Sequence, residues 1–118
     1  MSVMADSFRS RVIPLRQTQD RIPGPPGAHF VTVMQRGTVR ALLSRPVAPN
    51  RQTPHEQDEM YVIVRGRGVL FHDGHRDPFE TGDLIFVAAG TEHWFEEFTE
   101  DFAVWVVFYG PPEGEIPR

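Results

Sequence analysis

Two histidines and one glutamate have the side chains and the spacing that a metal site requires. His55 and Glu59 lie four residues apart in the stretch PHEQDEMYVIVRG, which occupies residues 54–66. A second stretch, GDLIFVAAGTEHW at residues 82–94, has a similar plan and supplies His93 near its end. Imidazole nitrogens and carboxylate oxygens bind several first-row metal ions. The three residues therefore predict a site for one divalent transition metal, with the choice between Fe, Zn, Mn and Ni left open.

The rest of the composition removes several other kinds of chemistry. The chain contains no cysteine, which excludes disulfides, thiolate ligands and a thiol nucleophile. All 12 basic residues are arginine, so a lysine Schiff base and a lysine general base are also excluded. Ser44 is the one serine beyond the N-terminal arm, and it does not stand in a nucleophile elbow. Histidine, carboxylate, tyrosine, arginine and a bound ion remain.

Length and charge indicate a single globular domain without a nucleic-acid or membrane partner. The 118 residues suffice for one domain, and the net charge of −4 with scattered arginines argues against a nucleic-acid partner. No apolar run approaches the ~20 residues that span a bilayer, so we expect no membrane partner. The N-terminal sequence MSVMADSFRSR lacks the apolar core of a signal peptide. We therefore expect a cytoplasmic protein.

Short apolar runs separated by glycine and proline dominate the chain. They predict strands at residues 30–35, 38–44, 59–64, 69–72, 75–80, 84–87, 94–98 and 102–109. Asp73 and Gly74 predict a two-residue hairpin turn, because both positions of that turn need positive φ. No window sustains a helical period. The pattern predicts an all-β sandwich or barrel.

Three segments divide the chain. We predict an N-terminal arm with a proline- and glycine-rich break at residues 1–27, a barrel domain at 28–112 and a polar tail at 113–118. The arm adds an edge strand, crosses to a neighbouring subunit or frays. Residues 60–64 and 102–109 are apolar on both strand faces, so the face outside the barrel needs cover. We predict a homodimer, with a monomer covered by its own arm as the alternative.

These motifs resemble the two sequence motifs of the cupin superfamily. His55, Glu59 and Gly66 have the spacing of the latter part of the first motif. Gly82, Gly90 and His93 fit the second motif, in which alanine replaces the usual proline at position 88. The resemblance covers about 40 contiguous residues, and it is the joint spacing that makes it specific. It implies a jelly-roll β-barrel, also called a double-stranded β-helix.

The resemblance also implies the ligand set. His55, Glu59 and His93 would hold a divalent metal inside the barrel. The first motif normally carries another histidine two positions before His55, where this chain has Thr53. Gln52 and Gln57 are polar neighbours, but neither stands at the spacing of the missing histidine.

Several functions fit such a site. We expect a metal-dependent oxygenase or isomerase for a small organic molecule, with Gln57, Tyr61, Arg40 and Trp105 as candidate pocket residues. Arg40, if it points inward, would pair with a substrate carboxylate. The alternatives are a non-catalytic metal or small-molecule binding module and a metal-free isomerase, like the sugar epimerases that resemble cupins. In the metal-free case His55 or His93 is the base and Tyr61 the acid.

Three further expectations concern acidic and basic residues near the motifs. Asp58 should point away from Glu59, because successive strand residues face opposite sides. His72 and His75 are expected at the surface.

Overall fold

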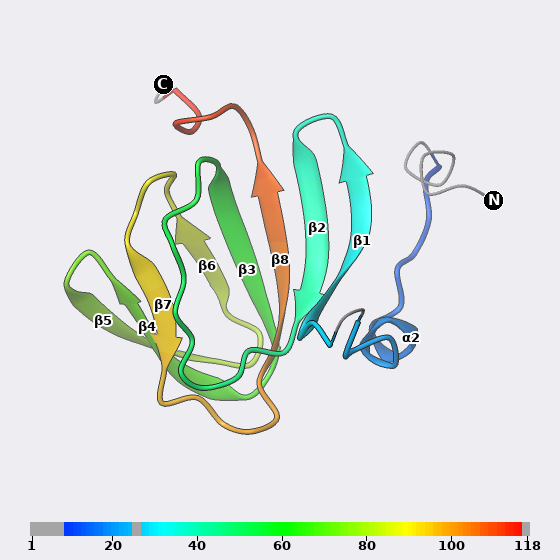
Figure 1. The fold of residues 1–118 in the computed structure, drawn as a ribbon, viewed down its shortest axis with the longest axis horizontal. Helices are drawn as coiled ribbons and strands as arrows, with labels where there is room; N and C mark the ends of the chain where they lie inside the picture. Colours follow the sequence, from blue (N-terminus) through cyan, green and yellow to red (C-terminus); the bar gives the residue numbers. More distant parts are fainter. Residues whose placement is uncertain (1–8, 25–26, 117–118) are drawn as a thin grey trace.

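Two antiparallel sheets face each other and form the body of the molecule (Figure 1). The computed structural model describes residues 9–24 and 27–116. The five-stranded sheet has the order β1-β2-β8-β3-β6, and the three-stranded sheet has the order β5-β4-β7. The elements are α2 (Leu15–Gln19), β1 (Phe30–Arg36), β2 (Val39–Ser44), β3 (Asp58–Arg65), β4 (Arg67–His72), β5 (His75–Glu80), β6 (Leu84–Val87), β7 (His93–Glu96) and β8 (Ala103–Tyr109).

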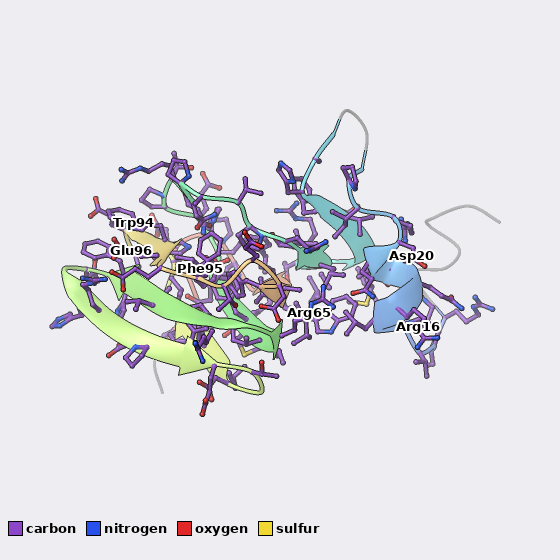
Figure 2. All side chains as sticks on the ribbon, turned by 90° about the horizontal axis from the view of Figure 1, so that it is seen from below. Arg16, Asp20, Arg65, Trp94, Phe95 and Glu96 are labelled. Atoms are coloured by element: carbon purple, nitrogen blue, oxygen red, sulfur yellow. The ribbon has the colours of Figure 1, made fainter. Side chains whose placement is uncertain are left out.

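The core lies between the two sheets and follows the two-residue alternation of the strands. Tyr61 and Ile63 of β3 pack with Val106 of β8 from one side, and Leu70 and Phe95 pack from the other. On β7, Phe95 points between the sheets while its two neighbours point away (Figure 2). The prediction of an all-β jelly roll is confirmed, and every predicted strand forms with bounds that differ by a few residues at most.

Two turns join β3, β4 and β5 as the sequence predicts. Asp73 has φ of 45° and Gly74 has φ of 80°, which is the left-handed geometry expected of the hairpin between β4 and β5. Gly66, between β3 and β4, has φ of 92°. A Cβ at this position would lie 2.8 Å from the Cα of Phe102 and 2.7 Å from Thr99 Oγ1. Glycine is therefore required there for both conformation and space.

The described part of the N-terminal arm forms a short helix instead of an edge strand. Helix α2 lies beyond β1 at the end of the five-stranded sheet (Figure 1). The hydroxyl of Thr18 donates to the carbonyl of Pro14, and Arg65 Nη1 of β3 donates to Gln19 Oε1. Five residues are too few to produce a helical period in the sequence. Residues 1–8 of the predicted arm lie outside the described residues.

The outer face of the five-stranded sheet is apolar. Leu84, Val62, Trp105 and Leu43 form one cross-strand row over β6, β3, β8 and β2. Leu43 is fully buried, but Leu84 is 65% exposed, Val62 40% and the neighbouring Phe86 57%. The exposed end of the row is consistent with a covering subunit, and the homodimer stays a prediction.

Within the described part of the chain, no helix has the length and apolar character needed to cross a membrane.

Candidate metal centre

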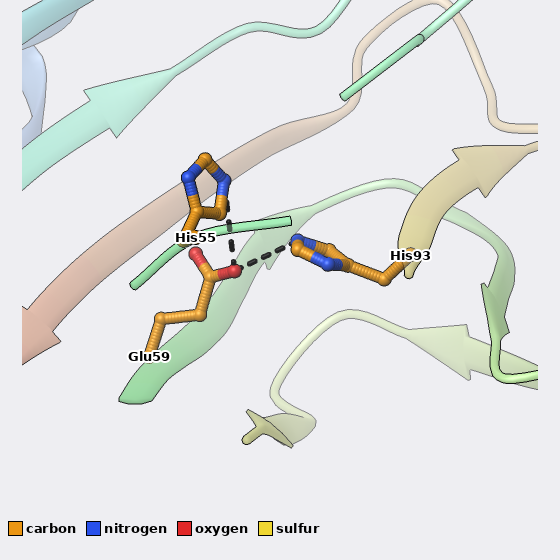
Figure 3. Close-up of side chains that lie close together, drawn as sticks. All are labelled: His55, Glu59 and His93. Atoms are coloured by element: carbon orange, nitrogen blue, oxygen red, sulfur yellow. Dashed lines mark ion pairs between the residues drawn. The ribbon is translucent and has the colours of Figure 1, made fainter. Parts of the chain in front are cut away.

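The three predicted ligands meet at one place between the sheets, although they come from distant parts of the chain. His55 lies in the loop before β3, Glu59 lies on β3 and His93 is the first residue of β7 on the opposite sheet. One ligand atom from each side chain falls within 4.8 Å of the other two. Figure 3 shows both imidazoles directed at the carboxylate of Glu59. The arrangement is a metal-capable group of two histidines and one glutamate.

The group has a buried half and an open half. Glu59 Oε1 lies 2.7 Å from His93 Nε2, and both side chains are 1% exposed. The same oxygen lies 3.8 Å from His55 Nε2, and the side chain of His55 is 32% exposed. An ion held here would therefore be reached from the His55 side.

The hydrogen bonds around Glu59 and His93 fit a cation between them. Neither carboxylate oxygen of Glu59 has a well-aligned hydrogen-bond partner among the described residues, although both are buried. His93 Nδ1 lies 2.8 Å from the carbonyl of Thr91, which can only accept, so Nδ1 carries the proton. Neutral His93 then directs the lone pair of Nε2 at a carboxylate oxygen. A buried carboxylate facing a lone pair is costly unless a proton or a metal ion lies between them.

The two histidines differ in pKa. Burial lowers the pKa of His93, but the Glu59 carboxylate and the Thr91 carbonyl raise it by more, so its pKa lies above the usual value. Burial lowers the pKa of His55, and this outweighs the attraction of Glu59; His93 and Arg40 lower it further. Without an ion, His93 keeps a second proton beside Glu59 to a higher pH than His55 does, and His55 is the more readily available neutral ligand.

Backbone contacts hold the two ligand-bearing loops together. The N–H of Gly90, in the loop before His93, donates to the carbonyl of His55 at 2.8 Å. The N–H of Ala89 donates to Oδ1 of Asp58, whose Oδ2 accepts from the N–H of Glu115. Asp58 is thus a buried loop anchor that faces away from Glu59, as the strand alternation predicts.

A cavity of about 370 Å³ opens beside the metal-capable group. Two predicted pocket residues, Arg40 and Tyr61, line it. The Tyr61 hydroxyl lies 3.1 Å from His93 Nε2. Burial and the negative charge of the nearby Glu59 hold the pKa of Tyr61 well above its usual value, so the phenol stays protonated. The remaining lining is mostly apolar and consists of Phe30, Leu42, Ser44, Pro46, Asn50, Arg51, Gln52, Phe95, Val104, Val106 and Phe108.

Two other predicted pocket residues do not line this cavity. Gln57 lies outside because its Nε2 donates to the carbonyls of Thr38 and Gly110, which fixes it against the end of the sheet. Trp105 lies on β8 between the inward-facing Val104 and Val106, so alternation places it on the outer face. Neither side chain therefore belongs to the lining of this cavity.

Residues outside the cavity take structural or surface positions. Thr53, which stands where the first cupin motif has histidine, is exposed. His72 Nε2 lies 2.6 Å from Asp77 Oδ2, and His75 is exposed. The surface prediction for these two histidines agrees with these positions.

Asn50 and Gln52 take a larger part in the site than the sequence predicted. Gln52 Oε1 lies 3.3 Å from His55 Nε2. Gln52 Nε2 donates to Asn50 Oδ1 at 2.8 Å, and the same Oδ1 accepts from the N–H of Phe95. Asn50 therefore fixes the amide of Gln52 with its oxygen toward His55. The loop at residues 46–54 has no periodicity that would reveal which side chains turn inward.

The chain is similar to known proteins both in sequence and in structure. A 62-residue stretch is 40% identical to an uncharacterized protein of Streptomyces coelicolor, over 52% of this chain and 58% of the relative. A 92-residue stretch is 31% identical to an acireductone dioxygenase of Synechococcus, over 67% of this chain and 51% of the relative. The chain thus spans just over half the length of these two relatives.

Solved structures share the fold. A cupin-2 domain protein from Shewanella frigidimarina matches with a TM-score of 0.64 at 13% identity, over 86% of this chain and 94% of that one. At this identity the likeness concerns the fold alone. The model of the cupin domain family matches residues 46–109, which include all three residues of the metal-capable group. This match extends over more than half of the sequence, and the chain therefore belongs to the cupin domain family.

Proposed function

We propose that this cupin is a divalent-metal-dependent enzyme of the dioxygenase type that acts on a small organic molecule. The observation that carries the proposal is the convergence of His55, Glu59 and His93 beside a largely apolar cavity. Two histidines and one carboxylate that leave coordination positions open are the ligand set of non-haem Fe(II) oxygenases. The name of the Synechococcus relative, a dioxygenase, supports the same reaction class.

Each side chain has a role in this proposal. His55, Glu59 and His93 hold the ion, and Gln52 supplies its amide oxygen as a fourth donor in place of the histidine that Thr53 replaces. A bound Fe(II) ion would supply a place where dioxygen and substrate react side by side. The Tyr61 hydroxyl donates a hydrogen bond to substrate oxygen. The apolar wall formed by Val104 and Val106 excludes water.

Nitric oxide provides a test that needs no knowledge of the substrate, since it binds non-haem Fe(II) where dioxygen would. Protein purified without metal and loaded anaerobically with Fe(II) should give the high-spin electron paramagnetic resonance signal of a ferrous nitrosyl complex. The His55→Ala protein should lose that signal, and the exposed-site control His75→Ala should keep it. An iron-loaded wild type that gives no such signal has no open position, which contradicts the dioxygenase proposal.

A metal-free isomerase is the second candidate, because one specific contact favours it. The hydroxyl of Tyr61 lies 3.1 Å from Nε2 of His93, the geometry of a paired acid and base. In this reading His93 Nε2 removes a proton from a carbon next to a carbonyl while Tyr61 donates its proton to the carbonyl oxygen, and the resulting enol is reprotonated on carbon with Tyr61 taking the proton back. This candidate would be favoured over the metal enzyme by isomerase activity that survives exhaustive chelation and is lost in the Tyr61→Phe protein.

A further inference from the structure

A cation lies in the cavity wall near the metal-capable group. Arg40, Leu42 and Ser44 are alternate residues of β2, and all three line the cavity. Alternation therefore directs the Arg40 side chain inward. Its guanidinium carbon lies 4.7 Å from the centre of the Phe108 ring. The imidazole of His55 lies 4.9 Å from the centre of that ring, so Phe108 contacts both the cation and the metal ligand.

Arg40 makes no ion pair with any residue of the described chain. Its contact with Phe108 is a cation–π contact, which leaves the planar edge of the guanidinium available for a ligand. The chain has 16 acidic residues, yet no described carboxylate lies within ion-pair distance of this guanidinium. The free edge of Arg40 therefore indicates a partner that is not part of the protein.

The charge of the cavity differs from that of the whole molecule. The protein has a net charge of −4, yet the cavity wall carries Arg40, Arg51 and one carboxylate, Glu59. Arg51 lies over the Trp94 ring at 5.6 Å and also has no ion pair among the described residues. A divalent ion beside Glu59 would make the cavity more positive. Such a cavity attracts anions.

We propose that the cavity binds a small organic carboxylate, whose carboxylate group pairs with Arg40 and whose opposite end lies at the metal centre. One planar guanidinium matches one carboxylate through two parallel hydrogen bonds. The apolar side chains of Leu42, Val104 and Val106 contact the carbon chain between the two ends. A phosphate is disfavoured, because a dianion is held by several donors. Arg40 is the only cavity-lining cation on a strand, and Arg51, the other arginine of the wall, lies over the Trp94 ring.

The placement of the second end rests on the proposed metal site, but the pairing with Arg40 does not. The test therefore uses protein in both metal-free and zinc-loaded forms, since zinc is inert to oxygen. Isothermal titration calorimetry compares isovalerate and 4-methylpentanoate with the corresponding neutral amides and with isobutyl phosphate. The variants are Arg40→Met, which keeps the stem and removes the charge, Arg40→Lys, and the control Arg67→Met on the exposed start of β4.

We expect wild-type protein and Arg67→Met to bind the carboxylates at least about tenfold more tightly than the amides, the loss typical of one charged hydrogen-bonded pair. Arg40→Met should abolish this difference without changing zinc content, and Arg40→Lys should restore part of it. Equal binding of acids and amides by wild type, tighter binding of the phosphate, or an unchanged preference in Arg40→Met would overturn the proposal. A preference that persists in a protein unable to bind zinc supports the Arg40 site and contradicts only the metal function.

Discussion

His93 Nε2 and Glu59 Oε1 lie 2.7 Å apart at a point where the two sheets of the barrel meet, and both side chains are 1% exposed. His93 Nδ1 donates its proton to the Thr91 carbonyl. The contact between Nε2 and Glu59 therefore needs either a second proton or a metal ion. The pair therefore connects the protonation of the metal-free protein to its ability to bind a metal.

The first prediction concerns pH. Because the pKa of His93 is raised, metal binding must displace a proton from Nε2, whereas His55 is already neutral. Apparent metal affinity should rise with pH by about tenfold per pH unit below the pKa of His93 and level off above it. Chelator competition with Zn²⁺ between about pH 6 and about pH 8 measures this. A flat profile over that range would contradict the protonation assigned to His93.

Stability of the metal-free protein should have the opposite pH dependence. A raised pKa in the folded state means that the folded state binds the proton more tightly than the unfolded chain does. This contribution is fully present below the unfolded pKa of about 6.5 and is lost as the pH rises through the pKa of folded His93. Urea unfolding of chelator-treated protein should show the decline, and His93→Gln should remove it.

Gln52 provides a prediction about the ligand set. If its amide oxygen is a fourth donor, Gln52→Leu should weaken Zn²⁺ binding by about tenfold or more without unfolding the protein, because it removes one donor and keeps the side-chain volume. Asn50→Ala should weaken binding less, since it only frees the amide to rotate. Gln35→Leu, an exposed change on β1, is the control. Unchanged affinity in Gln52→Leu would limit the ligand set to three residues.

Gly66 provides a prediction about the fold. Gly66→Ala introduces a Cβ 2.8 Å from the backbone of the buried Phe102 at positive φ, so both strain and overlap oppose it. We expect a loss of about 2–4 kcal/mol in the free energy of unfolding. Gly37→Ala is matched for positive φ but meets no atom within 4 Å, and should cost about 1 kcal/mol. Equal losses would show that the overlap at Gly66 relaxes freely.

The homodimer prediction rests on the apolar outer face of β6. Sedimentation velocity should give twice the chain mass of 13.5 kDa. Leu84→Glu should produce monomers, because it would bury an unpaired charge in the interface. Ile116→Glu is the control, since Ile116 is 86% exposed and lies in the C-terminal tail. A wild-type monomer would leave the exposed Leu84 and Phe86 without this explanation.

The sequence predicts the strands, the turn at Asp73 and the meeting of His55, Glu59 and His93, because alternation and motif spacing are local signals that this fold preserves. Prediction from the sequence fails where tertiary contacts decide the direction of a side chain. The amide of Gln57 donates hydrogen bonds to two backbone carbonyls at the end of the sheet. Trp105 faces outward because its neighbours Val104 and Val106 occupy the interior. The orientation of Gln52 depends on Asn50, and no periodic pattern in that loop reveals it.

The metal content of the purified protein tests the central claim most directly. After exposure to Fe(II), Zn²⁺, Mn²⁺ or Ni²⁺ and removal of excess ion, elemental analysis should find about one equivalent per chain of at least one metal, the stoichiometry of a single site. Glu59→Gln, which keeps the shape and removes the charge, should lose most of it, while the surface control Glu100→Gln should keep it. Less than about a tenth of an equivalent of every metal in the folded wild type would contradict a metal centre at these residues.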